Sequence, residues 1–278
     1  RTPDPAALAA ASPAGFRATW EPLLRQGPVE VIVFGDFDKA EGIEALRRTF
    51  GALAPREPLP PAIAARGSAF PEAGETVVEY HRGDANQAAA VIAWETGAGL
   101  AGLRESRQLE ILTQLFNNRL MQAMREHAGA SYAPVVRSEW PSDVPSGGRI
   151  SALAQLKPED VPIFFREADR IASDLATKPV GEDELTRVTE PLLQLLNRAS
   201  TGNTFWLYQL EGATFEPQRI ALLRSLLRDY TVTTPQAMQA LAAKYLAGKP
   251  GWRLAVIPQG QELATRVPEG ARGASSGR

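Results

Sequence analysis

Residues 87–127, QAAAVIAWETGAGLAGLRESRQLEILTQLFNNRLMQAMREH, decide the fold class of this chain. Gln87–Glu95 is a short apolar run with β-branched and aromatic members, which is typical of a strand. Leu103–His127 repeats leucine and phenylalanine at helical spacing and predicts a long amphipathic helix that ends at Gly129. A strand joined directly to a long helix indicates a domain that mixes α and β structure.

The flanking sequence extends this pattern on both sides. Upstream, Thr76–His81 predicts another strand, which we expect to form an antiparallel hairpin with Gln87–Glu95. Downstream, the pattern predicts strands over Tyr132–Trp140, Arg149–Leu156 and Trp252–Ile257, and several helices between Lys157 and Tyr245 that are interrupted at Lys178–Pro179, Thr201–Gly202 and Glu216–Pro217. Strands followed by a run of helices predict the α+β class.

The N-terminal part has its own pattern. A helix capped by Ser12–Pro13 ends at Gly27–Pro28, Val29–Phe34 predicts a strand, and Asp38 caps a further helix. Thr234–Pro235, a helix, Pro250 and the last strand follow in the same order, and cap and proline are sixteen residues apart in both places. The N-terminal part therefore resembles the end of a domain whose complete copy follows it.

Composition excludes several classes of function. The 278 residues carry 30 basic and 32 acidic side chains, so we expect neither nucleic acid nor an anionic membrane surface as a partner. No apolar stretch reaches the roughly 18 residues that a membrane helix needs, and no membrane insertion is expected. With no cysteine and two histidines, thiolate chemistry is excluded and histidine chemistry nearly so. The first residues contain neither an initiator Met nor a signal peptide, which suggests an excised or processed piece.

Classical site motifs are incomplete. Neither His81 nor His127 has a second histidine at metal-binding spacing, so we expect an exposed or capping imidazole at both positions. Gly97–Gly102 matches the G-x-G-x-x-G dinucleotide pattern, but the position where an acidic ribose ligand should end a strand falls inside the long helix. A strand-to-helix connection explains these glycines better. Ser131 has no histidine after it, which excludes the serine-hydrolase order.

Two further clusters have ordinary structural explanations. Glu182–Glu184 lies where a helix should begin, and carboxylates are favourable at that end of the helix dipole. Phe205–Tyr208 could line a binding groove, although core packing is the better explanation for an aromatic run between helices.

Arg125 and Tyr132 remain as candidate site residues. They lie at the end of the long helix and at the start of the next strand, so both donors can project into the same space. There they could hold a peptide carbonyl or a developing oxyanion without acting as acid or base. The structural alternative is an arginine that neutralises the helix dipole beside an edge tyrosine.

The sequence resembles the C-terminal half of the pitrilysin/insulinase family of zinc peptidases, the M16 group. Val31–Asp38, VIVFGDFD, is similar to the family's strand that ends in G-D-x-D, and Asn86–Trp94 is similar to the strand of the next repeat. Leu120–Tyr132, LMQAMREHAGASY, resembles the family's L-R-E-x-x-G-x-x-Y stretch, with Met124 in place of its leucine. The likeness runs from about residue 12 to residue 258.

The resemblance implies a fold and a division of labour. It implies a mainly antiparallel sheet with helices packed on one face, and it makes Arg125 and Tyr132 the pair that grips the substrate peptide. Zn²⁺, the nucleophilic water and the general base then belong to a partner half, upstream in the same polypeptide or on a separate subunit. We expect no metal ligand and no catalytic residue here, and no activity of the chain alone. By family analogy, the compartment is the bacterial periplasm.

These interpretations divide the chain into four parts. We expect the end of a preceding repeat, a Pro/Ala-rich linker, one complete α+β domain and a flexible tail, over residues 1–54, 55–71, 72–262 and 263–278. Two functions fit them: closure of a substrate chamber with a grip on the peptide backbone, or a structural or assembly subunit that no longer handles peptide.

Overall fold

The computed structural model describes residues 4–58, 69–128 and 133–264. They form two compact units. The first unit combines Arg1–Arg66 with Gly202–Pro217, and the second combines Gly67–Thr201 with Gln218–Arg278. Residues 202–217, which lie inside the expected 72–262 domain, thus belong to the first unit.

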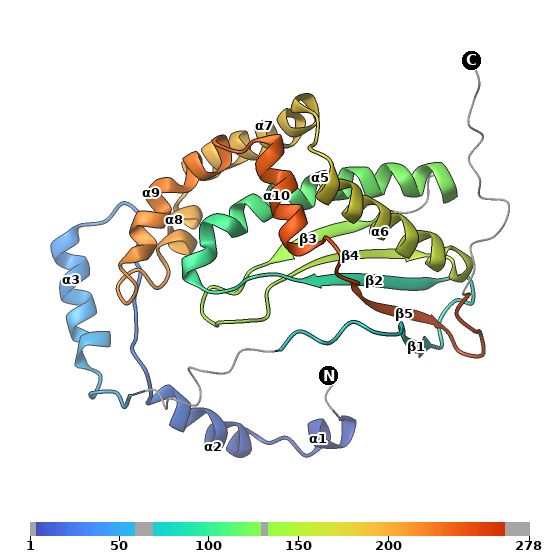
Figure 1. Cartoon of the computed structure of the whole chain (residues 1–278). Helices are drawn as coiled ribbons and strands as arrows, with labels where there is room; N and C mark the ends of the chain where they lie inside the picture. The colour runs from blue at the N-terminus through green and yellow to red at the C-terminus, as the bar shows by residue number, and fades with distance from the viewer. Residues whose placement is uncertain (1–3, 59–68, 129–132, 265–278) are drawn as a thin grey trace. The chain divides into compact units, whose positions relative to one another are not determined.

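The second unit is built on one five-stranded sheet (Figure 1). Its strands are β1 (Val77–His81), β2 (Ala88–Glu95), β3 (Val135–Glu139), β4 (Arg149–Leu156) and β5 (Trp252–Pro258). They are arranged in the order β1-β5-β2-β4-β3. β1 and β5 are parallel, and the other neighbouring pairs are antiparallel. The last strand in sequence therefore lies between the first two.

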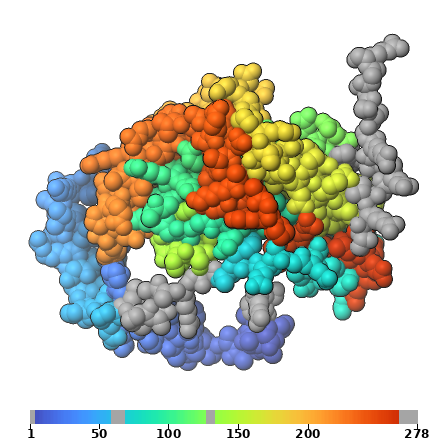
Figure 2. All heavy atoms as spheres, in the orientation of Figure 1, coloured from blue at the N-terminus to red at the C-terminus, as the bar shows by residue number. Residues whose placement is uncertain are grey.

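Helices cover one face of this sheet, as Figure 1 shows. They are α5 (Leu103–Ala128), α6 (Val161–Thr177) and α10 (Pro235–Tyr245), with α7 (Glu182–Ala199) and α9 (Gln218–Thr231) packed against α5. Short 3₁₀ turns, η2 (Leu100–Gly102) and η3 (Pro158–Asp160), precede α5 and α6. In the space-filling view α6 and α10 lie against each other above the strands (Figure 2). The expected α+β fold, a mainly antiparallel sheet with helices on one face, is confirmed.

Strand alternation explains which face is covered. Ile150, Ala152 and Ala154 of β4 are fully buried under the helices, whereas Leu153 between them is 44% exposed on the other face. The core beneath the helices includes large side chains such as Phe116 and Phe164.

The predicted hairpin between the first two strands is wrong. β1 and β2 are both present, but β5 lies between them and hydrogen-bonds to each. A connection of six residues, 82–87, separates β1 from β2. It is longer than a two-residue turn, so it can span the roughly 10 Å that an intervening strand requires.

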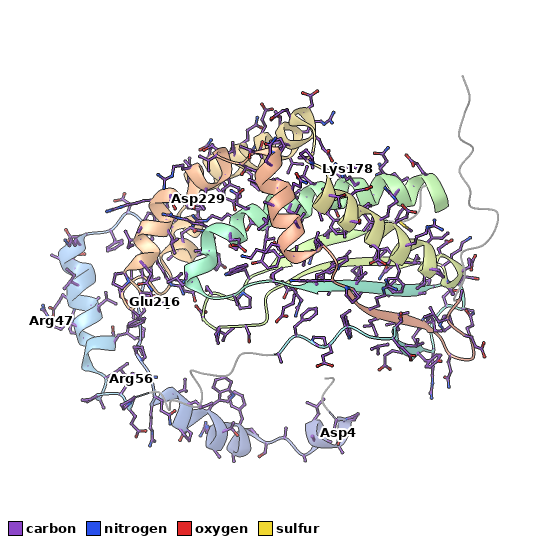
Figure 3. The ribbon with its side chains drawn as sticks, in the orientation of Figure 1. Asp4, Arg47, Arg56, Lys178, Glu216 and Asp229 are labelled. Atoms are coloured by element: carbon purple, nitrogen blue, oxygen red, sulfur yellow. The ribbon has the colours of Figure 1, made fainter. Side chains whose placement is uncertain are left out.

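The first unit contains short helices: α1 (Pro5–Ala9), α2 (Pro13–Leu24), α3 (Lys39–Arg48), η1 (Phe50–Ala52) and α8 (Asn203–Leu210). The predicted caps are present, because Ser12 Oγ accepts from the Gly15 amide at 3.1 Å and Asp38 Oδ1 accepts from the Glu41 amide at 2.9 Å. Arg56 closes the turn after α2 by donating to the carbonyl of Gly27 at 2.6 Å (Figure 3).

The predicted strand over Val29–Phe34 does not form in the described structure. A strand needs a hydrogen-bonded neighbour, and within the described ranges this segment pairs with none. The neighbouring Gln26 makes only an isolated bridge with Glu57. The β-branched sequence alone was therefore an insufficient predictor.

No helix in the described part of the chain is long and apolar enough to cross a bilayer.

Candidate functional site

The long helix α5 carries the candidate residue Arg125, and its N-terminal half is fixed by a buried ion pair. Arg107 Nη1 lies 2.6 Å from Asp229 Oδ2 of α9, and both residues are under a tenth exposed (Figure 3 labels Asp229). Ser225 Oγ also donates to Asp229 at 2.9 Å. Because the carboxylate is paired and hydrogen-bonded, its burial is compensated.

A second link joins α5 to α9 nearby. The buried hydroxyl of Tyr230 donates to Glu110 Oε2. Burial raises the pKa of Tyr230 above its ordinary value, and the negative charge of Glu110 raises it further. The phenol therefore stays protonated and keeps its role as a donor.

The C-terminal half of α5 is fixed by two polar links. The guanidinium of Arg119 binds Glu184 of α7 through two hydrogen bonds of 2.8 Å, and this pairing lowers the pKa of Glu184. Asn117 Oδ1 accepts from the Val136 amide of the edge strand β3 at 3.0 Å. α5 is thus linked to neighbouring elements in both of its halves.

Arg125 lies in the last turns of α5. It is exposed and has no ion-pair partner among the residues that the structure describes. It lines a shallow hollow of about 670 Å³ together with Asn117, Asn118, Met121, Gln122 and Glu126. Gln122 Nε2 donates to Glu126 Oε1 at 3.0 Å. Among the residues that line the hollow, Arg125 carries the positive charge.

The guanidinium of this surface can donate hydrogen bonds to carbonyl or carboxylate oxygens. A guanidinium offers five donors and stays charged at any physiological pH, so it binds and polarises but does not transfer protons. Tyr132, the expected second member of the pair, lies outside the described residues, as does Ser131. For His127, the structure describes the backbone of α5 alone.

His81 has a local structural role. Its Nδ1 accepts from the Gly83 amide at 2.9 Å, and its Nε2 lies 2.7 Å from the carbonyl oxygen of Gln87. Both ring nitrogens are therefore engaged in the turn after β1, as expected for a capping imidazole. Nowhere in residues 4–58, 69–128 and 133–264 do three or more His, Asp or Glu side chains form a group that could hold a metal ion. The described residues thus do not fit the Zn²⁺ of the family.

The glycines of the G-x-G-x-x-G pattern accommodate a tryptophan. A Cβ on Gly97 or Gly102 would lie 2.3 Å or 2.1 Å from the ring of Trp140. The indole Nε1 donates to the carbonyl of Gly99 at 2.9 Å. This packing explains the glycines without a nucleotide, in the strand-to-helix connection that the sequence predicted.

The acidic cluster lies where the sequence predicted, whereas the aromatic cluster does not form a core. The acidic run Glu182–Glu184 lies in the first turn of α7, as predicted. The aromatic run Phe205–Tyr208 is not buried in a core, because no residue of α8 is buried. Instead, Trp206 stacks on Phe34 with ring centroids 6.1 Å apart.

Arg107 is a buried supporting residue that was not identified from the sequence. It belongs to the helix that the sequence predicts as amphipathic, yet it is only 5% exposed. It shares the i, i+4, i+8 stripe with Ile111 and Leu115, which are both fully buried. That stripe was the available signal, because an arginine on an apolar stripe requires an acidic partner.

One family model matches the sequence. It describes the peptidase M16 inactive domain, and the match covers residues 16–192, well over half of the chain. Among curated proteins, none matches significantly.

Solved structures with the same fold share little sequence. A conserved protein from Enterococcus faecalis V583 and a peptidase M16 inactive domain from Pseudomonas fluorescens are both 16% identical, with TM-scores of 0.72. Each match covers 92% of this chain, and it covers 58% and 60% of the respective neighbours. The ferredoxin protease FusC, solved as a mutant in complex with Arabidopsis ferredoxin, is 16% identical with a TM-score of 0.67, over 93% of this chain and 28% of its own. The chain thus spans less than two thirds of each neighbour's length.

Proposed function

Because this chain belongs to the inactive-domain family of the M16 peptidases, we propose that it is the noncatalytic part of an M16-type zinc peptidase. In this proposal the chain closes the substrate chamber and grips the peptide backbone through Arg125 and Tyr132. The zinc ion, its activated water and the general base lie on a partner half, in the same polypeptide or on a separate subunit. The compartment we propose, by analogy with the family, is the bacterial periplasm.

The observation that carries the proposal is the state of Arg125. Its helix is fixed in both halves by polar links, while the guanidinium itself is exposed over a hollow and unpaired within the described residues. On the same helix, Arg107 and Arg119 each pair with an acidic side chain, whereas Arg125 does not within the described residues. An unpaired guanidinium on a rigid support can form a charge-assisted hydrogen bond with an incoming carbonyl oxygen.

The proposed grip positions the substrate and leaves the chemical step to the partner. Arg125 would donate to a peptide carbonyl oxygen, and the phenol of Tyr132 would donate to the same or an adjacent carbonyl. Neither group changes its protonation state. Closure of the chain over the peptide also excludes water, which strengthens both hydrogen bonds.

The test compares variants in the complete peptidase, formed with the zinc-bearing half. We expect Arg125→Ala to lower kcat/KM for peptide cleavage about 10- to 100-fold, because a hydrogen bond to a charged group contributes about 1.5–3 kcal/mol. Tyr132→Phe should lower it by a smaller factor. Both variants should associate with the zinc-bearing half as tightly as the wild type.

Arg228→Ala is the matched control, since Arg228 is also an exposed arginine in the last turn of a helix. It should leave cleavage unchanged. If Arg125→Ala cleaved peptide as fast as this control, the grip would be refuted and the second candidate, a structural or assembly subunit, would be favoured. The description of the matching domain as inactive is compatible with both candidates.

A further inference from the structure

The open face of the five-stranded sheet, which the helices of the second unit leave uncovered, carries a row of aliphatic side chains (Figure 1). The strand register places one aliphatic residue of each strand at the same level, and paired neighbours on adjacent strands point to the same face. In sheet order these residues are Val77, Leu254, Val91, Leu153 and Val135. An unbroken aliphatic row thus crosses all five strands.

The aliphatic row is accessible to solvent. The exposed fractions are 40% for Val77, 44% for Leu153 and 38% for Val135, and the other two members are partly exposed. Ala152, one position before Leu153, faces the helix layer and is fully buried. A contiguous apolar surface of this kind marks a place where another molecule binds.

An unpaired cation lies at one end of the row. Arg137 is the next residue after Val135 on the open face of the edge strand β3. It is exposed, and it has no hydrogen-bond or ion-pair partner among the residues that the structure describes. Arg149 on the neighbouring strand differs, because it is paired with Glu139. The guanidinium of Arg137 is therefore available to a ligand.

An unpaired anion lies at the other end. Glu79 is the next open-face residue after Val77 on the opposite edge strand, β1. It is exposed, and within the described ranges its carboxylate binds no other group. Its neighbour in the register is the apolar Val256 of β5, which cannot neutralise it.

The two charges lie on opposite sides of the row as well as at opposite ends. Through the register, Arg137 is level with Trp252 of β5, and Glu79 is level with Val256. These levels are two positions before and two positions after that of Leu254, which belongs to the row. A line from Glu79 to Arg137 therefore crosses the row diagonally.

The length of this diagonal corresponds to a short peptide. Four strand spacings cover about 19 Å across the sheet, and four residues cover about 14 Å along the strands. The diagonal is then about 24 Å, which an extended chain of about seven residues spans. Alternate side chains of such a chain point to one side, about 7 Å apart, so three of them can lie against the sheet.

We propose that the open face binds short extended peptides by their aliphatic side chains and by both of their free ends. The C-terminal carboxylate lies at Arg137, whose planar guanidinium can bind it through two hydrogen bonds. The N-terminal ammonium group lies at Glu79, and alternate aliphatic side chains cover the row. The inference rests on the proposed function in that it names the class of peptide that the chamber would hold.

The size of the surface favours a peptide over a second copy of this chain. The part of the face between Arg137 and Glu79 measures about 270 Å² from the strand spacings. A stable protein–protein interface buries about 800 Å² on each partner. The surface is thus too small to hold two copies together, whereas a short peptide fits it.

The test is calorimetric titration of the full chain with the heptapeptide AVALAVA. We expect amidation of the peptide's C-terminus to weaken binding to the wild type about 5- to 10-fold, because it removes the charge that Arg137 binds. Amidation should have no effect on binding to Arg137→Ala. Arg224→Ala, which replaces an exposed arginine of α9, is the matched control and should retain the full effect of amidation.

The other end and the row are tested in the same way. N-acetylation of the peptide should weaken binding to the wild type but not to Glu79→Gln. Leu153→Ser should weaken binding of the unmodified peptide about 5-fold, because a buried aliphatic contact is lost. Leu195→Ser, at a leucine of α7 that is 59% exposed, is the control and should bind as the wild type does.

Two results would overturn the proposal. The first is that the unmodified heptapeptide does not bind, or that amidation weakens binding equally in the wild type and in Arg137→Ala. The second is a dimer of the wild type in sedimentation that Leu153→Ser dissociates, because a second copy would then be the occupant.

Failure of this inference is distinguishable from failure of the proposed grip. Arg125→Ala is read out as peptide cleavage by the complete peptidase, whereas Arg137→Ala is read out as binding to this chain. A loss of cleavage in Arg125→Ala without any effect of the peptide's ends on binding would keep the grip and refute the peptide site. The opposite pair of results would keep the peptide site and refute the grip.

Discussion

Single residues decide how α5 is held, and Arg107 is the clearest case. Its guanidinium is buried and satisfied by Asp229, while Arg104, one turn earlier, is 57% exposed and 4.0 Å from the same carboxylate. The exposed fraction of the side chain is thus 57% for Arg104 and 6% for Arg107, although both lie on one helix. The difference predicts very unequal contributions to stability.

Arg107→Ala should lower the free energy of unfolding by about 3–5 kcal/mol, because it leaves the Asp229 carboxylate buried without its partner. Arg104→Ala should lower it by no more than about 1 kcal/mol, as expected for an exposed pair. Urea denaturation of both variants measures the difference. Equal effects of the two substitutions would show that the buried pair does not hold α5 to α9.

The pair Arg119–Glu184 gives a pH-dependent effect. The two hydrogen bonds from Arg119 lower the pKa of Glu184 below its ordinary value, so the ionised carboxylate stabilises the folded state. This stabilisation is complete above the pKa of the unfolded state, about 4.3. It is lost as the pH falls through the lowered pKa of the folded state.

Glu184→Gln should therefore lower the free energy of unfolding at pH 7 by about 1 kcal/mol, since the pair is partly exposed. Its difference from the wild type should shrink as the pH falls below about 4. The control is Glu182→Gln in the same helical turn. Urea titrations at pH 3 and pH 7 test this, and a pH-independent difference would contradict the assigned cause.

At the scale of elements, α5 acts as a support between the sheet and the candidate site. Asn117 and Asn118 are adjacent but have different environments. Asn117 Oδ1 accepts from the backbone amide of Val136 on the edge strand β3, and Asn118 is exposed in the hollow. The first amide therefore secures β3 to α5, and the second has no such role.

Asn117→Ala should lower the free energy of unfolding by about 1–3 kcal/mol, because the Val136 amide loses its acceptor in a buried position. Asn118→Ala should change it by less than about 0.5 kcal/mol. Hydrogen exchange provides a local readout, since the Val136 amide should exchange faster in Asn117→Ala alone. An unchanged exchange rate would show that β3 does not depend on this link.

The elements that local sequence determines were predicted correctly. The N-caps Ser12, Asp38 and Thr234 begin helices where expected. Strand pairing was not predictable, because hydrogen bonds between strands depend on residues far apart in sequence. β5 begins more than 150 residues after β2 in the sequence, yet the two strands are paired. No local pattern in the 82–87 connection indicates that β5 lies between β1 and β2.

The candidate site was predictable only in part, because its supporting contacts also join residues far apart in sequence. The sequence placed Arg125 at the end of a helix, and the structure adds that polar links hold both halves of this helix. The supporting ion pair was missed because Arg107 and Asp229 are 122 positions apart. The segment Val29–Phe34 was predicted as a strand from its composition, although a strand also requires a partner.

At the scale of the whole molecule, the proposed function assigns the grip on the peptide to this chain and the metal to a partner half. The described residues contain no group of three or more potential metal ligands, and the matching family is an inactive domain. Under the proposed function, the chain depends on its partner for both metal and catalysis. This dependence is the central claim, and it can be tested on the chain alone.

The most direct measurement is metal analysis of the purified chain together with a peptide-cleavage assay in excess Zn²⁺. We expect far less than one zinc ion per chain and no cleavage that a chelator abolishes. One tightly held zinc ion per chain, accompanied by chelator-sensitive peptide cleavage, would contradict the account.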